Sequence, residues 1–180
     1  MSTSSTVAAG DLILASQYNN LRTDVLSTHD HITSGEGSQL IARESKASSE
    51  TVNGSSTLQN DDDLVVAVGT NQIWEMFLWA RYTSGTTPDI KFAWTIPASA
   101  VMWRVAFRKS TTYGWVDPTN DSTAIVADGD GATEREYLER VFVTTAGTAG
   151  NVQLQWAQNT SDASDTIVLA GSRLLAFRIA

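Results

Sequence analysis

The 180-residue chain has two histidines, His29 and His31, which flank Asp30 in the sequence Thr-His-Asp-His. In an extended segment both imidazole rings project to the same side, where they can bind a metal ion if further ligands converge on it. One chain supplies too few ligands, but three copies around a three-fold axis would complete an octahedral transition-metal site. The alternative interpretation is a pair of solvated histidines in a polar linker.

Acidic side chains gather in two places that resemble calcium-binding turns. Neither has the spacing of an EF-hand loop, because the first group is contiguous and the second is too spread out. We interpret both groups as solvated turn residues, and the first group also as gatekeeper charges before the strand that follows it. The first group is Asp61-Asp62-Asp63, and the second is Asp117, Asp121, Asp128 and Asp130.

No catalytic motif is recognisable in the sequence. It has no G-x-S-x-G, no phosphate-binding loop and no H-E-x-x-H. The carboxylates of Glu134 and Glu136 share one face of a predicted strand, but with Arg135, Glu139 and Arg140 around them they have the pattern of exposed strand charges. We therefore expect no enzymatic activity, and no cofactor apart from the metal ion considered above.

The six tryptophans are the other candidates for a binding site, because a tryptophan-rich β-sandwich can bind sugars by ring stacking. Three of them alternate with polar residues on the same parity as aliphatic residues, which predicts core positions. The core candidates are Trp74, Trp94 and Trp156, whereas the pattern does not assign Trp79, Trp103 and Trp115.

Composition restricts the class of protein. A net charge of −8 and a pI near 4.6 argue against nucleic acid or an anionic membrane as a partner. The absence of cysteine excludes disulfides, thiol catalysis and thiolate zinc sites. No apolar run approaches the roughly 20 residues that span a bilayer, and the first residues do not resemble a signal peptide. We expect synthesis in the cytoplasm and no membrane insertion.

The elements that would position these residues are strands. Residues 73–82 and 90–96 both alternate with period two, and the turn signal Ser84-Gly85-Thr86-Thr87-Pro88 between them predicts a hairpin. Trp74, Met76, Leu78, Ala80 and Tyr82 share one face of the first strand, and Ile90, Phe92, Trp94 and Ile96 share one face of the second.

Strand patterns separated by turn signals recur from Ala47 to the end of the chain, at a spacing typical of a sandwich or barrel. They predict an all-β domain over residues 47–180 with about eight or nine antiparallel strands, best described as a jelly-roll β-sandwich. The further strands are expected at residues 47–52, 64–68, 101–108, 123–127, 135–145, 151–158 and 173–179.

Residues 1–46 are predicted to be an attachment arm. A short amphipathic helix is expected over residues 16–26, since Tyr18, Leu21 and Val25 fall at i, i+3 and i+7. Three turns are marginal alone, so this stripe is expected to dock on its own sandwich, on another copy or on a different protein. A polar linker follows it over residues 27–56.

Two segments resemble virion proteins of tailed bacteriophages. Residues 9–22 (AGDLILASQYNNLR), followed by His29-Asp30-His31, resemble the N-terminal attachment region of tail and appendage proteins. Residues 51–96 are similar to small β-sandwich modules of head decorations, head fibres and minor tail proteins. The resemblance implies trimeric assembly, attachment to capsid or tail proteins through the arm, and a metal-binding H-x-H pair on the trimer axis. The attachment residues would be Leu14, Tyr18, Leu21 and Val25, and the metal ligands would be His29 and His31.

The expected function is therefore that of a non-enzymatic phage structural protein located in the virion. A capsid-decorating or head-fibre protein fits the short chain best, and a tail- or baseplate-attached protein is the alternative. A carbohydrate-binding module that contacts a host-surface glycan is the runner-up from a different class.

Overall fold

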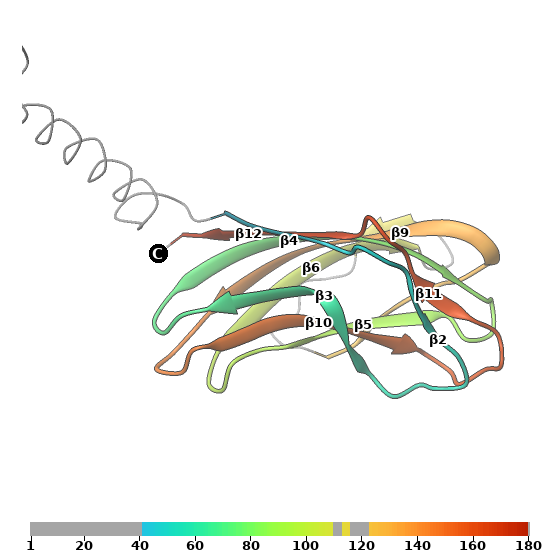
Figure 1. The fold of residues 1–180 in the computed structure, drawn as a ribbon, viewed down its shortest axis with the longest axis horizontal. Coiled ribbons are helices and arrows are strands. Elements are labelled where there is room, and N and C mark those ends of the chain that lie inside the picture. The colour runs from blue at the N-terminus through green and yellow to red at the C-terminus, as the bar shows by residue number, and fades with distance from the viewer. Residues whose placement is uncertain (1–40, 110–112, 116–122, 180) are drawn as a thin grey trace, which may run out of the picture. The chain divides into compact units, whose positions relative to one another are not determined.

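The computed structural model describes residues 41–109, 113–115 and 123–179, and residues 41–180 form one compact unit. The described residues fold into two antiparallel β-sheets that pack on each other as a β-sandwich, which confirms the predicted fold class (Figure 1). No helix in this part of the chain is long and apolar enough to cross a membrane. The predicted arm helix lies outside the described residues.

The large sheet has eight strands and the small sheet has four. The main path of the large sheet runs in the order β1 (Ile41–Ser45), β12 (Arg173–Arg178), β4 (Ile73–Ser84), β9 (Gly131–Thr144), β6 (Val101–Lys109) and β7 (Tyr113–Trp115). Beside it, β11 (Thr166–Val168) pairs with β4 and with β2 (Glu50–Val52). The small sheet runs in the order β3 (Gln59–Val68), β10 (Gly150–Gln158), β5 (Ile90–Thr95) and β8 (Ile125–Ala127).

The strand pairing is that of a jelly roll, in which one long hairpin is wound up so that its first and last strands pair. Here β1 pairs with β12, β3 with β10, β4 with β9, and β5 with β8. Strands β2 and β11 also form an antiparallel pair, and in chain order this pair falls between the β1–β12 pair and the β3–β10 pair. Strands β6 and β7 pair with each other as the innermost hairpin of this series, and they extend the large sheet beyond β9.

The predicted hairpin between residues 73–82 and 90–96 is wrong. Strand β4 lies in the large sheet and β5 in the small sheet, so the turn between them crosses from one layer to the other (Figure 1). Both predicted faces are nevertheless buried, apart from the partly buried Ile96, because the two strands pack against each other through the core instead of pairing edge to edge. Local turn residues allow either connection, since they fix the turn and not the partner of the strand.

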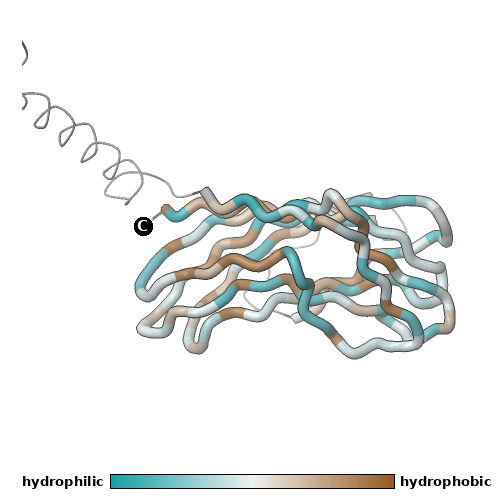
Figure 2. The backbone as a smooth tube through the Cα atoms, in the orientation of Figure 1, coloured by the Kyte–Doolittle hydropathy of each residue, from teal (hydrophilic) through white to brown (hydrophobic). Residues whose placement is uncertain are grey.

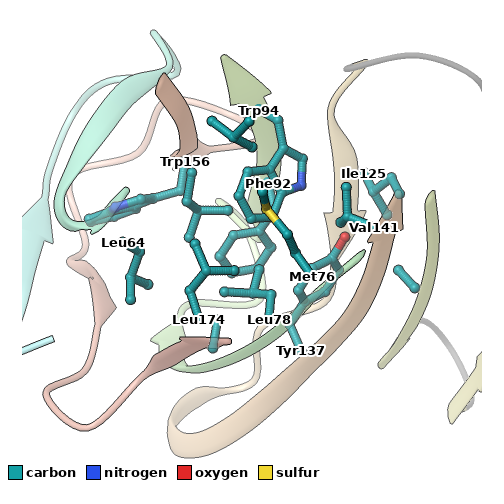
Figure 3. Packing of buried hydrophobic residues seen from close by; sticks show 14 of the residues in the cluster. Leu64, Met76, Leu78, Phe92, Trp94, Ile125, Tyr137, Val141, Trp156 and Leu174 are labelled. Atoms are coloured by element: carbon teal, nitrogen blue, oxygen red, sulfur yellow. The ribbon is translucent and has the colours of Figure 1, made fainter. Parts of the chain in front are cut away.

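The core lies between the sheets and is built by alternation along the strands. Figure 2 shows hydrophobic and hydrophilic residues alternating along the chain. The inward side chains of β4 and β12 in the large sheet meet those of β3, β10 and β5 in the small sheet (Figure 3). Phe92 and Tyr137 stack from opposite sheets with ring centroids 4.3 Å apart. Trp74, Trp94 and Trp156 are all buried, as their parity predicts.

Strand β1 extends the sandwich to residues that the sequence analysis placed in the arm. Its five residues pair with β12, from Ile41 opposite Phe177 to Ser45 opposite Arg173. Residues 41–46 look polar in sequence, but pairing on an edge strand needs little apolar surface. That residues 1–46 carry attachment stays a prediction.

Four connections gather at the end of the sandwich opposite Ile41. They are tied by hydrogen bonds between residues far apart in the chain, among them Gly54 N to Asp162 O and Thr160 N to Pro88 O, both at 2.9 Å. The amide nitrogen of Gly129 also donates to Asp89 Oδ1 at 2.9 Å. These loops therefore form one connected tip.

Candidate functional site

The outer side of the large sheet carries a broad apolar surface, which we call the aromatic face. Even-numbered residues of β4 point into the core, so the odd-numbered residues point outward, and the neighbouring strands continue this pattern in register. Its apolar members are Ile73, Phe77, Trp79, Val101, Trp103, Val105, Phe107, Leu138, Phe142, Leu175, Phe177 and Ile179.

Several of these side chains are strongly exposed for apolar residues. The exposed fraction is 63% for Val101, 51% for Trp79, 48% for Ile179 and 41% for Phe77. Isolated exposed apolar residues are common on protein surfaces and need no explanation, but a contiguous patch marks an interaction site. The aromatic face is therefore the candidate functional site of this domain.

Ring contacts connect the aromatic face across strands. Trp103 lies beside Phe142, with ring centroids 5.6 Å apart, and Phe77 meets Phe177 edge to face at 6.0 Å. The guanidinium carbon of Arg140 lies 4.6 Å from the centroid of Phe142 and 5.9 Å from that of Phe77. These edge-to-face and cation–π contacts order the rings, so the face is largely preformed.

A shallow groove of about 530 Å³ crosses the aromatic face. Phe77 and Trp79 line it together with Val105, Leu138 and Leu175, and its polar boundary includes Arg140 and Arg173. A smaller hollow of about 250 Å³ adjoins it and shares Trp79 and Arg173. Trp79 thus stands between an apolar groove and a more polar pocket.

The polar pocket is held in shape by Arg81. Its guanidinium donates to both carboxylate oxygens of Glu134, with Nε to Oε1 at 2.5 Å and Nη2 to Oε2 at 2.9 Å, and Nη1 donates to the carbonyl of Ala170 at 3.0 Å. Glu134 raises the pKa of Arg81 above its ordinary value by hydrogen bonding and charge. Gly171 has φ +84°, and a Cβ there would lie 3.1 Å from Nη1, so glycine suits this approach.

The outer side of the small sheet differs in chemistry. Its exposed and half-buried positions mix amides and hydroxyls with charged and smaller apolar residues, and some of the amides hydrogen-bond to one another, as in Gln155 Nε2 to Asn60 Oδ1 at 2.9 Å. On the same side, Thr95 Oγ1 donates to Asn60 Oδ1, and Gln153 Nε2 donates to the carbonyl of Asp61. Of the two outer sheet surfaces in the described structure, only that of the large sheet carries strongly exposed large apolar side chains.

Glu139 is buried, which corrects its assignment as an exposed strand charge. It faces the core from β9, where Arg104 Nη1 lies 3.2 Å from its Oε1 and Trp94 Nε1 donates to its Oε2 at 2.9 Å. Burial raises the pKa of Glu139, and the Arg104 charge opposes that rise. The pair sits inside the sandwich and satisfies a buried indole, so its role is structural.

Asp61 is also buried, although it was predicted to be a solvated turn residue. Its Oδ2 accepts a hydrogen bond from Lys46 Nζ at 2.9 Å, and its Oδ1 accepts one from the amide of Leu64 at 2.9 Å. Lys46 is buried as well and pairs with Glu50 at 2.9 Å. This ion pair ties the residue after β1 to β3, and both carboxylate oxygens of Asp61 are engaged within the domain.

The residues predicted to attach the protein or to bind metal lie outside the described residues. This holds for Leu14, Tyr18, Leu21 and Val25, and for the two histidines His29 and His31. Within the described part of the chain, no group of three or more His, Cys, Asp or Glu side chains could hold a metal ion.

Sequence reasoning missed the aromatic face, although the signal was present. Phe77 and Trp79 are odd-numbered residues in a strand whose even-numbered residues from Trp74 to Tyr82 are all apolar, so the middle of β4 is apolar on both sides. A strand of this kind in an antiparallel sheet requires cover on both faces. Trp79 and Trp103, which the pattern left unassigned, both belong to this face, and the side chain of Trp115 lies outside the described residues.

Comparison with known proteins does not assign the chain to a family. No protein-family model matches the chain, and no curated protein matches it. One solved structure, "Structure of infectious bursal disease virus Gx strain", aligns with a TM-score of 0.22 and 6% identity, over 78% of this chain and 40% of that chain. A similarity at this level does not show a common fold.

Proposed function

We propose that this protein is a non-enzymatic structural component of a tailed-bacteriophage virion, a capsid-decorating or head-fibre protein. In this proposal the N-terminal arm attaches to other virion proteins and the jelly roll projects from the particle. The observation that carries it is the aromatic face, an extensive preformed contact surface on a domain whose buried ionic groups have structural roles. The resemblance of residues 9–22 to phage attachment regions supports the choice of particle.

The jelly roll fits this role but does not specify it, because the same fold serves viral capsid proteins, lectins and other families. A large exposed apolar surface is expensive to leave in water and is usually covered in the working assembly. An acidic chain with such a face matches a component that is soluble after synthesis and then assembles.

Copy number separates the head from the tail. Quantitative mass spectrometry of purified particles should give hundreds of copies for a capsid decoration or head fibre, and a handful for the alternative tail- or baseplate-attached protein. Absence from purified particles would overturn the proposal in both forms.

The arm can be tested with a matched pair of substitutions. Leu21→Asp should abolish incorporation into particles, because it places a charge in the stripe that the predicted helix must bury. Asn20→Asp adds the same charge off that stripe and should be incorporated normally. Equal incorporation of both variants would show that the stripe does not attach the protein.

Carbohydrate binding is the second candidate function, and Trp79 favours it. An exposed indole beside the polar pocket of Arg81, Glu136 and Arg173 offers a stacking surface next to hydrogen-bonding groups. On a glycan array, Trp79→Ala should then remove binding that Thr95→Ala, on the opposite outer surface, retains. A wild-type protein that binds no glycan would eliminate this candidate.

A further inference from the structure

We propose that the aromatic face is covered by the same face of other copies of this chain, which converge on a symmetry axis. The inference deepens the proposed function, because it names the partner of this surface in the assembly. Three copies, each turning its large sheet toward a three-fold axis, would bury three such faces together.

The face has the size of an interface core. Its width from β6 to β1 covers five strands, and its apolar rows run from Val101 to Phe107, so its footprint is roughly 20 Å by 20 Å from standard strand spacings. A standard interface buries about 800 Å² on each partner, with an apolar core and a polar rim. The aromatic face supplies the core, and the charged residues around it supply the rim.

Charge favours another copy as the occupant. The chain has a net charge of −8, so most of its surface repels a second copy. The described charged side chains that point outward from the large sheet are nearly balanced, so copies can approach each other here with the least repulsion. They are Arg43, Arg81, Arg140 and Arg173, and Glu75, Glu134 and Glu136.

The rim charges are also divided between the two sides of the face, apart from Arg140 on β9, whose charge is paired with Glu75. Arg43 and Arg173 lie on β1 and β12, on one side of β4, whereas Glu136 lies on β9, on the other side. In a cyclic assembly one side of each face meets the opposite side of the next copy. Arg43 and Arg173 of one copy would thereby approach Glu136 of the next copy.

The chain contains no cysteine, so a single introduced cysteine reports contacts between copies. Thr144 lies on the aromatic face between Ile73 and Val101, and Thr95 is an exposed strand threonine on the outer side of the small sheet. With a short bismaleimide and the full-length protein, Thr144→Cys should give covalent pairs and Thr95→Cys should not. Equal cross-linking of the two, or none at Thr144, would overturn the inference.

Charge substitution gives an independent measurement. Val101→Arg should weaken association on the order of 100-fold, because it buries an unpaired charge between apolar faces, while Thr95→Arg should leave it unchanged. Light scattering over a concentration series measures both, and circular dichroism confirms that both variants fold. The inference would be overturned if the wild-type protein were a monomer at micromolar concentration. That result is expected if a glycan or another protein, and not a second copy, covers the face.

The two proposals fail in different ways. Protein that is present in particles but does not cross-link at Thr144→Cys would contradict the interface alone. Protein that cross-links there but never enters particles would contradict the virion function and leave the interface standing.

Discussion

At the scale of single residues, the tryptophans separate by the layer into which they point. Trp74 and Trp94 are buried, and each indole donates its Nε1 proton, to Gln72 Oε1 at 3.0 Å and to Glu139 Oε2 at 2.9 Å. Trp79 and Trp103 belong to the outer face and are held by neighbouring rings and aliphatic groups. The same residue type therefore packs in the core between the sheets and also forms part of the exposed outer face of the large sheet.

Trp94→Ala should lower the free energy of unfolding by about 3 to 5 kcal/mol, because it leaves a cavity and removes the hydrogen bond to Glu139. Trp79→Ala is the matched control, and in the unassembled protein it should cost less than about 1 kcal/mol, because half of its side chain is exposed. Urea denaturation below the association concentration measures both. Equal losses for the two variants would contradict the division into core and surface tryptophans.

Tyr137 makes the stability of the folded domain depend on pH in the alkaline range. Burial, together with the nearby Glu139 charge, raises the pKa of its phenol well above the ordinary value of about 10. The unfolded chain therefore releases this proton at lower pH than the folded chain does. The contribution of this group is complete below about pH 10 and is lost as the pH rises toward the folded pKa.

Tyr137→Phe removes this dependence. The stability of the wild type relative to the variant should be constant from about pH 8 to about pH 9.5 and should fall above about pH 10. Urea midpoints of the two proteins across that range measure the difference. Parallel curves up to about pH 11.5 would mean that the phenol titrates alike in the folded and unfolded chains.

At the scale of elements, strand alternation was readable and strand partners were not. The inward residues of β4, β5 and β10 follow from period two, because one side of each strand enters the core. The crossing of β4 and β5 between sheets depends on contacts with β9, β10 and β12, which lie far along the chain. Strands β1 and β11 were missed because, at five and three residues, they are too short to show a repeating pattern.

The charged residues Asp61 and Glu139 could not be placed from sequence for a related reason. Each is buried because a specific partner reaches it, Lys46 in one case and Arg104 in the other. Those partners are separated from them by many residues, so no local pattern reports the pair. Hydrophobic periodicity thus predicts the apolar core well and its ionic contacts poorly.

Strand β1 belongs to the folded domain, so the starting residue of a shortened chain matters. A chain beginning at Ile41 should fold with full stability, whereas one beginning at Ala47 should lose at least about 3 kcal/mol. The shorter chain lacks the strand that covers the edge of β12, and it lacks Lys46, which leaves Asp61 buried without its cation. Lys46→Met in the longer chain separates the ionic effect from the loss of the strand.

Urea midpoints of the three proteins give these values. If the chains beginning at Ile41 and Ala47 had equal stability, neither β1 nor the Lys46 to Asp61 pair would contribute to the domain.

At the scale of the whole molecule, we predict a homotrimer with His29 and His31 near its axis. Light scattering on the full-length protein should give three times the monomer mass of 19.4 kDa. Metal analysis of the purified trimer should detect a transition metal that His29→Ala with His31→Ala removes. A metal-free trimer that is unaffected by this double substitution would return both histidines to the solvated interpretation.

Strand β1 enters the large sheet at Ile41, in antiparallel register with β12, and among the described strands β12 alone is hydrogen-bonded to it. Mechanical load carried by the preceding segment would therefore reach the domain through these five residue pairs. A pull along the strand axis loads all of their hydrogen bonds at once, in shear, whereas a pull at right angles opens them one after another. The force that the domain withstands should thus depend on the direction in which its arm is pulled.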